Sequence, residues 1–235
     1  MHRTRIKICG LTRAEDVAAA VAAGADALGF VFYGKSARHV TPQLAARLMA
    51  AVPPFVATVG LFVNATAEEI AATLAIAPVS LLQFHGDETP EQCAAAAAVV
   101  NRPFMVALRV RTGMVAADLI KYESRCRAAG PLFAGLLLDA FVDGYGGGGK
   151  VFDWSVIPEE LAPRVVLSGG LHVQNATDAV LRVRPHAVDV SSGVEASSGE
   201  TRQPGIKDAA RIAAFIDAVR AGDATAAGRR AGIPT

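Results

Sequence analysis

Residues 80–108, SLLQFHGDETPEQCAAAAAVVNRPFMVAL, contain one complete unit of the pattern that decides the fold. The apolar run at the start of this stretch predicts a buried strand, and the alanine-rich residues 91–99 predict a helix. Thr89 and Gln92 lie three residues apart at the start of that helix, which is the spacing of a capping box. A second apolar run ends the stretch. The pattern therefore predicts two parallel strands joined by a crossover helix.

The same alternation continues along nearly the whole chain and predicts a single closed (β/α)8 TIM barrel of the α/β class. Thr66 and Glu69 have the spacing of a second capping box. No GxGxxG turn follows the first expected strand, so a closed barrel is favoured over an open doubly wound sheet. The expected strands cover residues 5–9, 27–32, 55–62, 80–84, 104–108, 132–138, 165–167 and 187–190.

The length and composition fit one barrel with a large apolar core. The chain has 235 residues, of which 52% are hydrophobic and 19% are charged, and this composition does not fit a disordered protein. We expect the barrel over residues 1–220. The last segment, 221–235, is rich in Gly and Ala and lacks periodicity, so it is expected to be a flexible C-terminal tail.

Charge and hydropathy limit the expected partners and location. The 23 Lys and Arg residues and 22 Asp and Glu residues give a net charge of +1, whereas nucleic-acid binding proteins carry a clear basic excess. No stretch approaches the roughly 20 apolar residues that cross a bilayer. The basic N-terminus lacks the apolar segment of a secretory signal. We expect a cytoplasmic protein that binds a small molecule and neither nucleic acid nor membrane.

The three cysteines indicate neither a disulfide framework nor a thiolate zinc site. Cys9, Cys93 and Cys126 are odd in number, far apart and without CxxC spacing. Cys93 and Cys126 fall in expected helices, and we interpret them as small buried side chains. A lone histidine, His85, follows the fourth expected strand and is a poor basis for a metal site, so no metal is expected.

Cys9 and Asp139 are the candidate catalytic residues because they lie at the ends of the first and sixth expected strands. A thiol near a cation forms a thiolate more readily and can then remove a proton. The apolar run before Asp139 favours a protonated carboxyl that can act as a general acid. The alternatives are a small buried thiol at Cys9 and a loop or N-cap carboxylate at Asp139.

Arg38 and His85 are candidate substrate-binding residues at the same mouth. Arg38 lies in the loop after the second expected strand and suits a bidentate pair with a substrate carboxylate, unless it is simply a solvated loop residue. His85 is expected to hydrogen-bond the substrate.

Lys7 and Asp189 are expected to form an ion pair beneath the substrate. If Cys9 faces the mouth, the period of two places Lys7 in the barrel interior, where an unpaired ammonium costs several kcal/mol. Asp189 lies on the eighth expected strand, which neighbours the first when the barrel closes, and it is also a candidate substrate-binding residue. In the alternative, a shifted register lets Lys7 reach solvent at the other end of the barrel.

Two glycine-containing turns predict a phosphate site. Gly169 and Gly170 follow the seventh expected strand, and Ser191, Ser192 and Gly193 follow the eighth. Barrels commonly bind phosphate at these two positions, where backbone N–H groups face the anion. Two ordinary strand-to-helix turns are the alternative.

The motifs together resemble those of phosphoribosylanthranilate isomerases over residues 5–220. They occur in the family's order around the barrel. The sequence departs from the family at Gly148, where a threonine is usual in the glycine-rich loop 146–149, and at His39, where a tyrosine is common. The matching segments are Lys7-Ile8-Cys9-Gly10, Ser36-Ala37-Arg38, Gln83-Phe84-His85-Gly86, Leu138-Asp139, Phe152-Asp153-Trp154, Ser168-Gly169-Gly170-Leu171 and Asp189-Val190-Ser191-Ser192-Gly193-Val194-Glu195.

The resemblance implies an isomerase of tryptophan biosynthesis that performs an Amadori rearrangement. The substrate would be N-(5-phosphoribosyl)anthranilate and the product 1-(2-carboxyphenylamino)-1-deoxyribulose 5-phosphate. Asp139 would protonate the ring oxygen, Cys9 would remove the C2 proton, and Arg38 would hold the anthranilate carboxylate. No cofactor is implied because only protons move, and a monomer or weak homodimer is expected.

Two alternatives to this function remain. Another phosphosugar barrel isomerase is the first, but the histidine-pathway isomerase typically has a carboxylate where this chain has Cys9, and a pentulose-phosphate epimerase needs a metal cluster. A catalytically silent phosphate-binding barrel is the second. Loss of anthranilate-linked substrate fluorescence without added metal distinguishes an isomerase from a silent binder.

Overall fold

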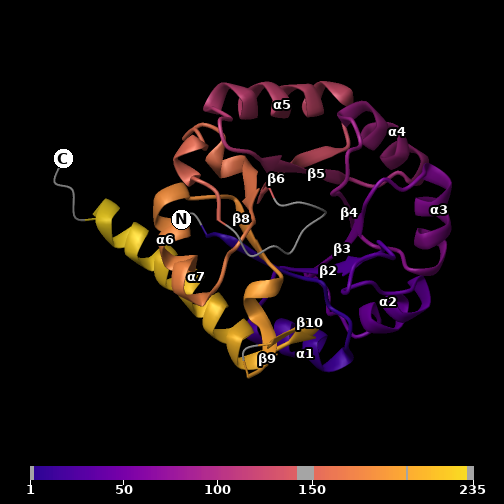
Figure 1. The fold of residues 1–235 in the computed structure, drawn as a ribbon, viewed down its shortest axis with the longest axis horizontal. Helices are drawn as coiled ribbons and strands as arrows, with labels where there is room; N and C mark the ends of the chain where they lie inside the picture. Colours follow the sequence, from indigo (N-terminus) through magenta and orange to yellow (C-terminus); the bar gives the residue numbers. More distant parts are fainter. Residues whose placement is uncertain (1–2, 142–150, 200, 232–235) are drawn as a thin grey trace.

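The eight expected strands form a closed parallel barrel in a computed structural model that describes residues 3–141, 151–199 and 201–231 (Figure 1). Each strand pairs with the next along the chain, and β8 pairs with β1 to close the sheet. The strands are β1 Arg5–Cys9, β2 Ala27–Val31, β3 Ala57–Phe62, β4 Leu81–Phe84, β5 Phe104–Val110, β6 Phe133–Ala140, β7 Val165–Leu167 and β8 Ala187–Val190. The predicted TIM barrel is confirmed.

Helices surround the barrel in a ring, as Figure 1 shows. Both predicted capping boxes form: the Thr66 and Thr89 hydroxyls accept hydrogen bonds from the N–H groups of Glu69 and Gln92. The connection from β6 to β7 is an exception to the alternation, since its described residues contain only the 3-10 turns η1 Trp154–Val156 and η2 Ala162–Arg164. The helices are α1 Ala14–Ala23, α2 Pro42–Met49, α3 Ala67–Ile76, α4 Pro90–Val100, α5 Ala116–Ala129, α6 Val173–Val183 and α7 Ala209–Ala231.

The strand period of two divides the buried side chains into an outer and an inner group. On β6, Leu136 and Leu138 belong to the large core between barrel and helices, whereas Leu137 belongs to a small apolar cluster inside the barrel. Val59 and Met105 pack in the same inner cluster. Asp139 lies two residues beyond Leu137 on the inward face, so the apolar cluster forms the floor beneath the polar mouth.

A two-stranded antiparallel hairpin follows β8 and was not expected from the sequence. It consists of β9 Glu195–Ser198 and β10 Thr201–Lys207, and it lies beside α1 at the rim of the barrel (Figure 1). Lys207 pairs in register with Glu195. The hairpin is docked through its backbone: the Thr12 hydroxyl donates to the Gly205 carbonyl oxygen at 2.5 Å, and the Lys207 N–H donates to Asp16 at 3.0 Å.

The expectation of a flexible tail from residue 221 is wrong for the part that the structure describes. Helix α7 continues to Ala231, and Ala226 on it is buried. Asp223 accepts hydrogen bonds from both the N–H and the hydroxyl of Thr4, each at 2.8 Å. The segment lacked a clear apolar stripe, and a polar contact with the N-terminal residues docks it instead.

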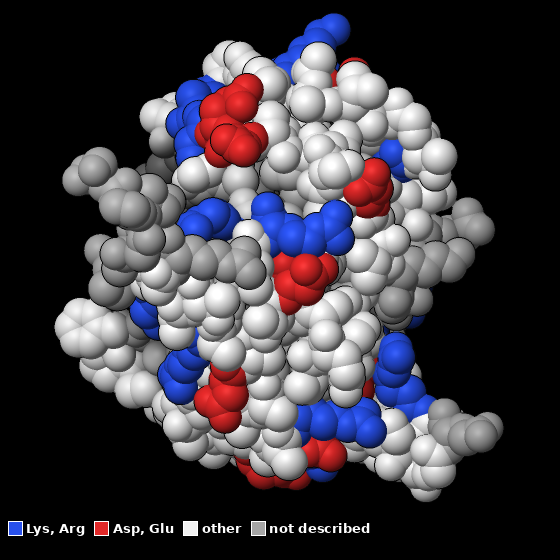
Figure 2. Space-filling view, turned by 90° about the vertical axis from the view of Figure 1, so that its left-hand side faces the viewer, with Lys and Arg blue, Asp and Glu red and all other residues white. Residues whose placement is uncertain are grey.

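The described surface carries mixed charges. On the face shown in Figure 2, basic side chains lie among acidic ones. Within the described ranges, no helix is long and apolar enough to span a bilayer.

Replacing Asp223 with Ala should lower the free energy of unfolding by about 1 to 3 kcal/mol, because the buried Thr4 N–H and hydroxyl lose their acceptor. Urea denaturation measures the change. Asp217→Ala is the matched control, since Asp217 lies on the same helix with a side chain that is 77% exposed. Equal stability of the two variants would contradict the docking role of Asp223.

Candidate active site

Three candidate site residues lie at the mouth of the barrel. Cys9 is the last residue of β1, His85 directly follows β4, and Asp139 lies near the end of β6. All three are buried. Gly29 on β2 makes the necessary room, because a Cβ atom there would lie 2.7 Å from the Cys9 Sγ and 3.1 Å from the Lys7 Nζ. The thiol and the ammonium therefore share a space that a larger residue at position 29 would fill.

The predicted Lys7–Asp189 ion pair is confirmed. The two residues are register partners across the β1–β8 seam, and the Lys7 Nζ lies 2.8 Å from Asp189 Oδ1 with both side chains buried. Burial lowers the pKa of Lys7, but Asp189 and Cys9 together outweigh burial and raise that pKa above its usual value. The Ser168 hydroxyl lies 3.5 Å from the second Asp189 oxygen. Contact between Asp189 and substrate stays a prediction.

Two effects act in opposite directions on the pKa of the Cys9 thiol. Burial raises its pKa above the usual value, while the neighbouring Lys7 ammonium acts in the opposite direction. The charge of Lys7 therefore favours the thiolate of Cys9, but its effect on the pKa is smaller than the effect of burial. The thiol form of Cys9 is therefore favoured over the thiolate more than in a free cysteine.

Asp139 is held by a short chain of side chains that begins at Gln83. The Gln83 Nε2 lies 2.9 Å from His85 Nδ1, and His85 Nε2 lies 3.0 Å from Asp139 Oδ2. With Gln83 as the donor, Nδ1 is the acceptor and Nε2 carries the proton that points to Asp139. The Ala140 N–H donates to Asp139 Oδ1 at 2.9 Å.

His85 therefore contacts the candidate acid, and its direct contact with substrate stays a prediction. Both ring nitrogens already have partners in the protein. The sequence offered one signal for Gln83 that was not used: it lies two residues before His85 and thus on the same face of the strand.

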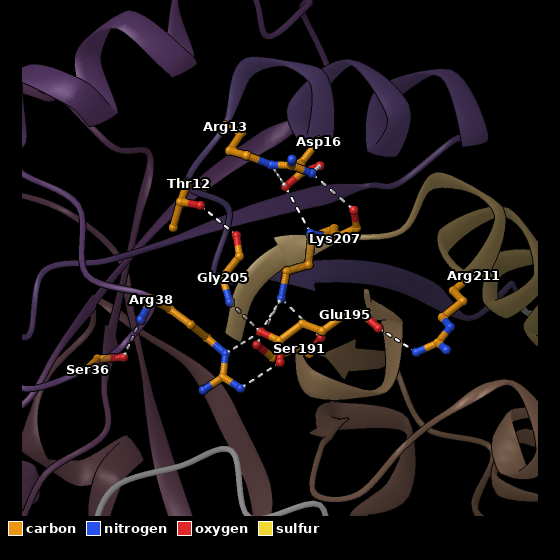
Figure 3. Close-up of polar contacts among 10 residues, drawn as sticks. All are labelled: Thr12, Arg13, Asp16, Ser36, Arg38, Ser191, Glu195, Gly205, Lys207 and Arg211. Carbon is orange, nitrogen blue, oxygen red and sulfur yellow. Dashed lines mark hydrogen bonds and ion pairs between the residues drawn. The ribbon is translucent and has the colours of Figure 1, made fainter. Parts of the chain in front are cut away.

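Arg38 forms a bidentate pair with Glu195, a residue to which the sequence analysis assigned no role. Arg38 Nε donates to Glu195 Oε1 at 2.6 Å, and Nη2 donates to Oε2 at 2.9 Å (Figure 3). Lys207 approaches Oε1 to 3.2 Å. Burial raises the pKa of Glu195, but the Arg38 hydrogen bonds and the Lys207 charge outweigh burial and lower it below its usual value.

The two candidate phosphate turns come together as their positions predicted. A Cβ atom on Gly193 would lie 2.0 Å from the Leu171 carbonyl oxygen, so the turn after β8 packs directly against the segment after β7. The 3-10 turn η3 Ser192–Val194 begins at once after Ser191. Lys207 Nζ supports this turn by donating to the Ser191 carbonyl oxygen at 3.0 Å.

Glycine residues 169 and 170 lie in the β7 turn, both with positive φ. The glycine-rich loop 146–149, including Gly148, lies outside the described residues.

The other two cysteines are buried in helices, and no metal site is found among the described residues. Cys93 and Cys126 are buried on α4 and α5, and burial raises the pKa of Cys126 to about 12. Burial also raises the pKa of Cys93. No group of three or more His, Cys, Asp or Glu in the described parts of the chain is arranged to hold a metal ion.

The chain matches the family model of N-(5'phosphoribosyl)anthranilate (PRA) isomerase over residues 6–218. The chain belongs to this family. An N-(5'-phosphoribosyl)anthranilate isomerase of Herminiimonas arsenicoxydans is 66% identical over 224 residues, which cover 95% of this chain and 96% of the relative. One of Ralstonia nicotianae is 54% identical, with 95% and 96% covered.

Solved structures agree with this assignment. The phosphoribosyl anthranilate isomerase of Thermotoga maritima is 40% identical, with a TM-score of 0.78 and coverage of 92% of this chain and 98% of that one. A second isomerase structure, 36% identical with a TM-score of 0.73 and the same coverage, contains reduced 1-(o-carboxyphenylamino)-1-deoxyribulose 5-phosphate.

Lys7→Met should lower the free energy of unfolding by about 3 to 5 kcal/mol, because Asp189 is left as an unpaired buried charge. The pKa of Cys9 should rise further, since the charge that opposes burial is gone. Chemical denaturation measures the first effect and the ultraviolet absorbance of the thiolate against pH the second.

The double variant Lys7→Met/Asp189→Leu is the control for this prediction. It removes both charges and should recover much of the lost stability while keeping the raised pKa of Cys9. A Lys7→Met variant with unchanged stability and an unchanged Cys9 titration would contradict the role given to the pair.

Proposed function

We propose that Asp139 and Cys9 act as the acid and the base of the isomerase reaction in this barrel. As a PRA isomerase family member, the chain is an aldose–ketose isomerase of tryptophan biosynthesis. It converts N-(5-phosphoribosyl)anthranilate into 1-(2-carboxyphenylamino)-1-deoxyribulose 5-phosphate by an Amadori rearrangement. The observation that carries the assignment is the convergence of a buried thiol on β1 and a buried carboxyl on β6 at one mouth.

Asp139 opens the sugar ring in the first step. Its carboxyl proton passes to the furanose ring oxygen, the C1–O bond breaks, and the nitrogen lone pair forms the protonated Schiff base. His85 supports this step, because its Nε2 proton points at Oδ2 and holds the carboxyl in one orientation. A fixed acid is more effective than one that rotates freely at the mouth.

Cys9 reacts as the thiolate, after its thiol proton has passed to solvent at the mouth, and its sulfur takes up the C2 proton in the second step. The C–H electron pair then forms the C1–C2 double bond and the Schiff-base electrons return to nitrogen, which gives the enolamine. Because burial disfavours the thiolate, the positive charge of the Schiff base supplies the further stabilisation that the thiolate needs. The enolamine finally tautomerises to the ketose. The proposal calls for no cofactor, because each step moves only protons and electron pairs of the substrate.

The two ends of the substrate have separate proposed sites. Arg38 holds the anthranilate carboxylate, since a guanidinium recognises a planar carboxylate through paired hydrogen bonds. Gly169, Gly170 and the Ser191–Gly193 turn hold the phosphate through backbone N–H groups, as is common after the last two strands of such barrels. The contact between the two turns supports this site.

We also propose a monomer or weak homodimer in the cytoplasm. One solved relative is described as the mutually generated monomers of a dimeric isomerase from Thermotoga maritima. In this chain the fully exposed Phe55, in the loop before β3, is an apolar side chain that a second copy would cover.

Cys9→Ser and Asp139→Asn should each lower kcat by about 10²-fold or more, the scale of general acid and base catalysis, with much smaller changes in substrate binding. The rate is measured from the loss of anthranilate-linked substrate fluorescence without added metal. Cys93→Ala is the control, because this buried thiol lies on α4 away from the mouth. Turnover near that of the unmodified chain in either variant would refute its role, and an unchanged signal with the unmodified chain would favour a silent binder.

Arg38→Ala should weaken binding of the anthranilate half of the substrate and leave the affinity for inorganic phosphate nearly unchanged. The reason is that Arg38 and the phosphate turns bind opposite ends of the ligand. Calorimetric titration with reduced product and with inorganic phosphate separates the two effects. Equal losses for both ligands would indicate a general structural role.

A further inference from the structure

Glu195 occupies only one edge of the Arg38 guanidinium. Its two oxygens accept hydrogen bonds from Nε and Nη2. The other edge, made by Nη1 and the second N–H of Nη2, has no hydrogen-bond partner among the residues that the structure describes. A guanidinium carries five donors in one plane, so the remaining edge can bind a second carboxylate in the same bidentate manner.

The carboxylate of Glu195 is fixed by partners on the hairpin. Its side chain is completely buried. The Gly205 N–H donates to Oε1 at 2.9 Å, and Lys207 Nζ approaches the same oxygen to 3.2 Å (Figure 3). Because Lys207 is the register partner of Glu195, the backbone pairing of β9 and β10 itself places the two charges together. The carboxylate of Glu195 is therefore a fixed hydrogen-bond partner for Arg38.

The two oxygens of Glu195 have different partners. Oε1 accepts from the hairpin as well as from Arg38, whereas Oε2 accepts only from Arg38 among the described residues. Contacts with the hairpin explain the position of Oε1 but not that of Oε2. The second oxygen sets the rotation of the guanidinium, because two parallel hydrogen bonds fix a plane and one does not.

Arg38, Glu195 and Lys207 form a charged cluster that can bind an anion. Arg38 and Lys207 share the single carboxylate of Glu195, and burial lowers the pKa of Lys207 below its usual value. A ligand carboxylate on the open edge of Arg38 would complete two ion pairs. Lys207 also donates to the carbonyl and hydroxyl oxygens of Ser191, in the turn assigned to phosphate, so one buried cluster supports both ends of the proposed substrate.

We propose that Glu195 is a positioning residue that fixes the Arg38 guanidinium so that its open edge receives the anthranilate carboxylate. This inference rests on the proposed role of Arg38. Glu195 itself does not touch substrate. Its contribution is the orientation of Arg38, and Lys207 holds Glu195 in place.

Two ligands that differ only in the carboxyl group test the inference. The first is reduced 1-(o-carboxyphenylamino)-1-deoxyribulose 5-phosphate, and the second is the same compound with a phenylamino group that lacks the carboxyl. Glu195→Gln keeps the size of the side chain but offers only one acceptor oxygen. It should weaken binding of the first ligand about tenfold and change binding of the second much less, since misorientation of one charged group is costly. KM should rise in parallel, with a smaller change in kcat.

Glu123→Gln is the matched control. Glu123 is also a buried carboxylate, paired with Arg127 and Arg164, but it lies on α5, outside the barrel mouth. This variant should leave the affinity for both ligands unchanged. Should Glu195→Gln fold poorly, Glu195→Gln/Lys207→Met removes both buried charges together. Loss of the Lys207 contacts with Ser191 should weaken both ligands in this variant, and the carboxylate ligand should still lose more affinity than the ligand without the carboxyl.

A double-mutant cycle with Arg38→Ala separates the inference from the proposed function. If Glu195 acts through Arg38, Glu195→Gln should cause no further loss of affinity for the carboxylate ligand in the Arg38→Ala background. Equal loss for both ligands in Glu195→Gln would make Glu195 a fold anchor and overturn the inference. Full ligand discrimination in Glu195→Gln, together with its loss in Arg38→Ala, would overturn the inference alone. Full discrimination in Arg38→Ala would overturn the proposed role of Arg38 as well.

Discussion

The pairing of β1 with β8 is the constraint on which the rest of the structure depends. It closes the sheet and sets Lys7 opposite Asp189 with both charges inside the barrel. A buried ammonium and a buried carboxylate are tolerated only when they meet, so the two charges depend on the closure of the barrel that pairs them. The same seam places the Cys9 thiol one strand away from the turn that contains Ser191, and thus brings the candidate base close to the phosphate turn.

Inside the barrel, the charged side chains of Lys7, Asp139 and Asp189 lie at the catalytic end, and apolar residues lie below them and outside the sheet. The inner apolar cluster fills the lower lumen, and the large outer core fixes the strands against the helices. The polar groups are therefore held by a rigid frame. Neighbouring side chains orient two of them: His85 hydrogen-bonds Asp139, and Glu195 hydrogen-bonds Arg38. Lys7 acts on Cys9 through its charge, which lowers the pKa of the thiol. Fixed groups of this kind lose little entropy when a substrate binds.

The hairpin β9–β10 links the fold to the site. Its backbone is docked on Asp16 of α1 and on Thr12 in the loop before α1, while Lys207 and Gly205 contact Glu195 (Figure 3). Arg38 is thereby connected to the hairpin through one buried carboxylate.

The sequence by itself determined the features that depend on local pattern. Alternating apolar runs and capping boxes gave the barrel, and the strand period of two was enough to place Lys7 against Asp189 once closure was assumed. The tertiary structure alone decided the pairing of Arg38 with Glu195, which lie 157 residues apart, and the docking of Asp223 on Thr4, which lie 219 residues apart. The hairpin strands are polar and contain no apolar alternation, so backbone pairing and contacts with α1 stabilise them instead of their own sequence preference.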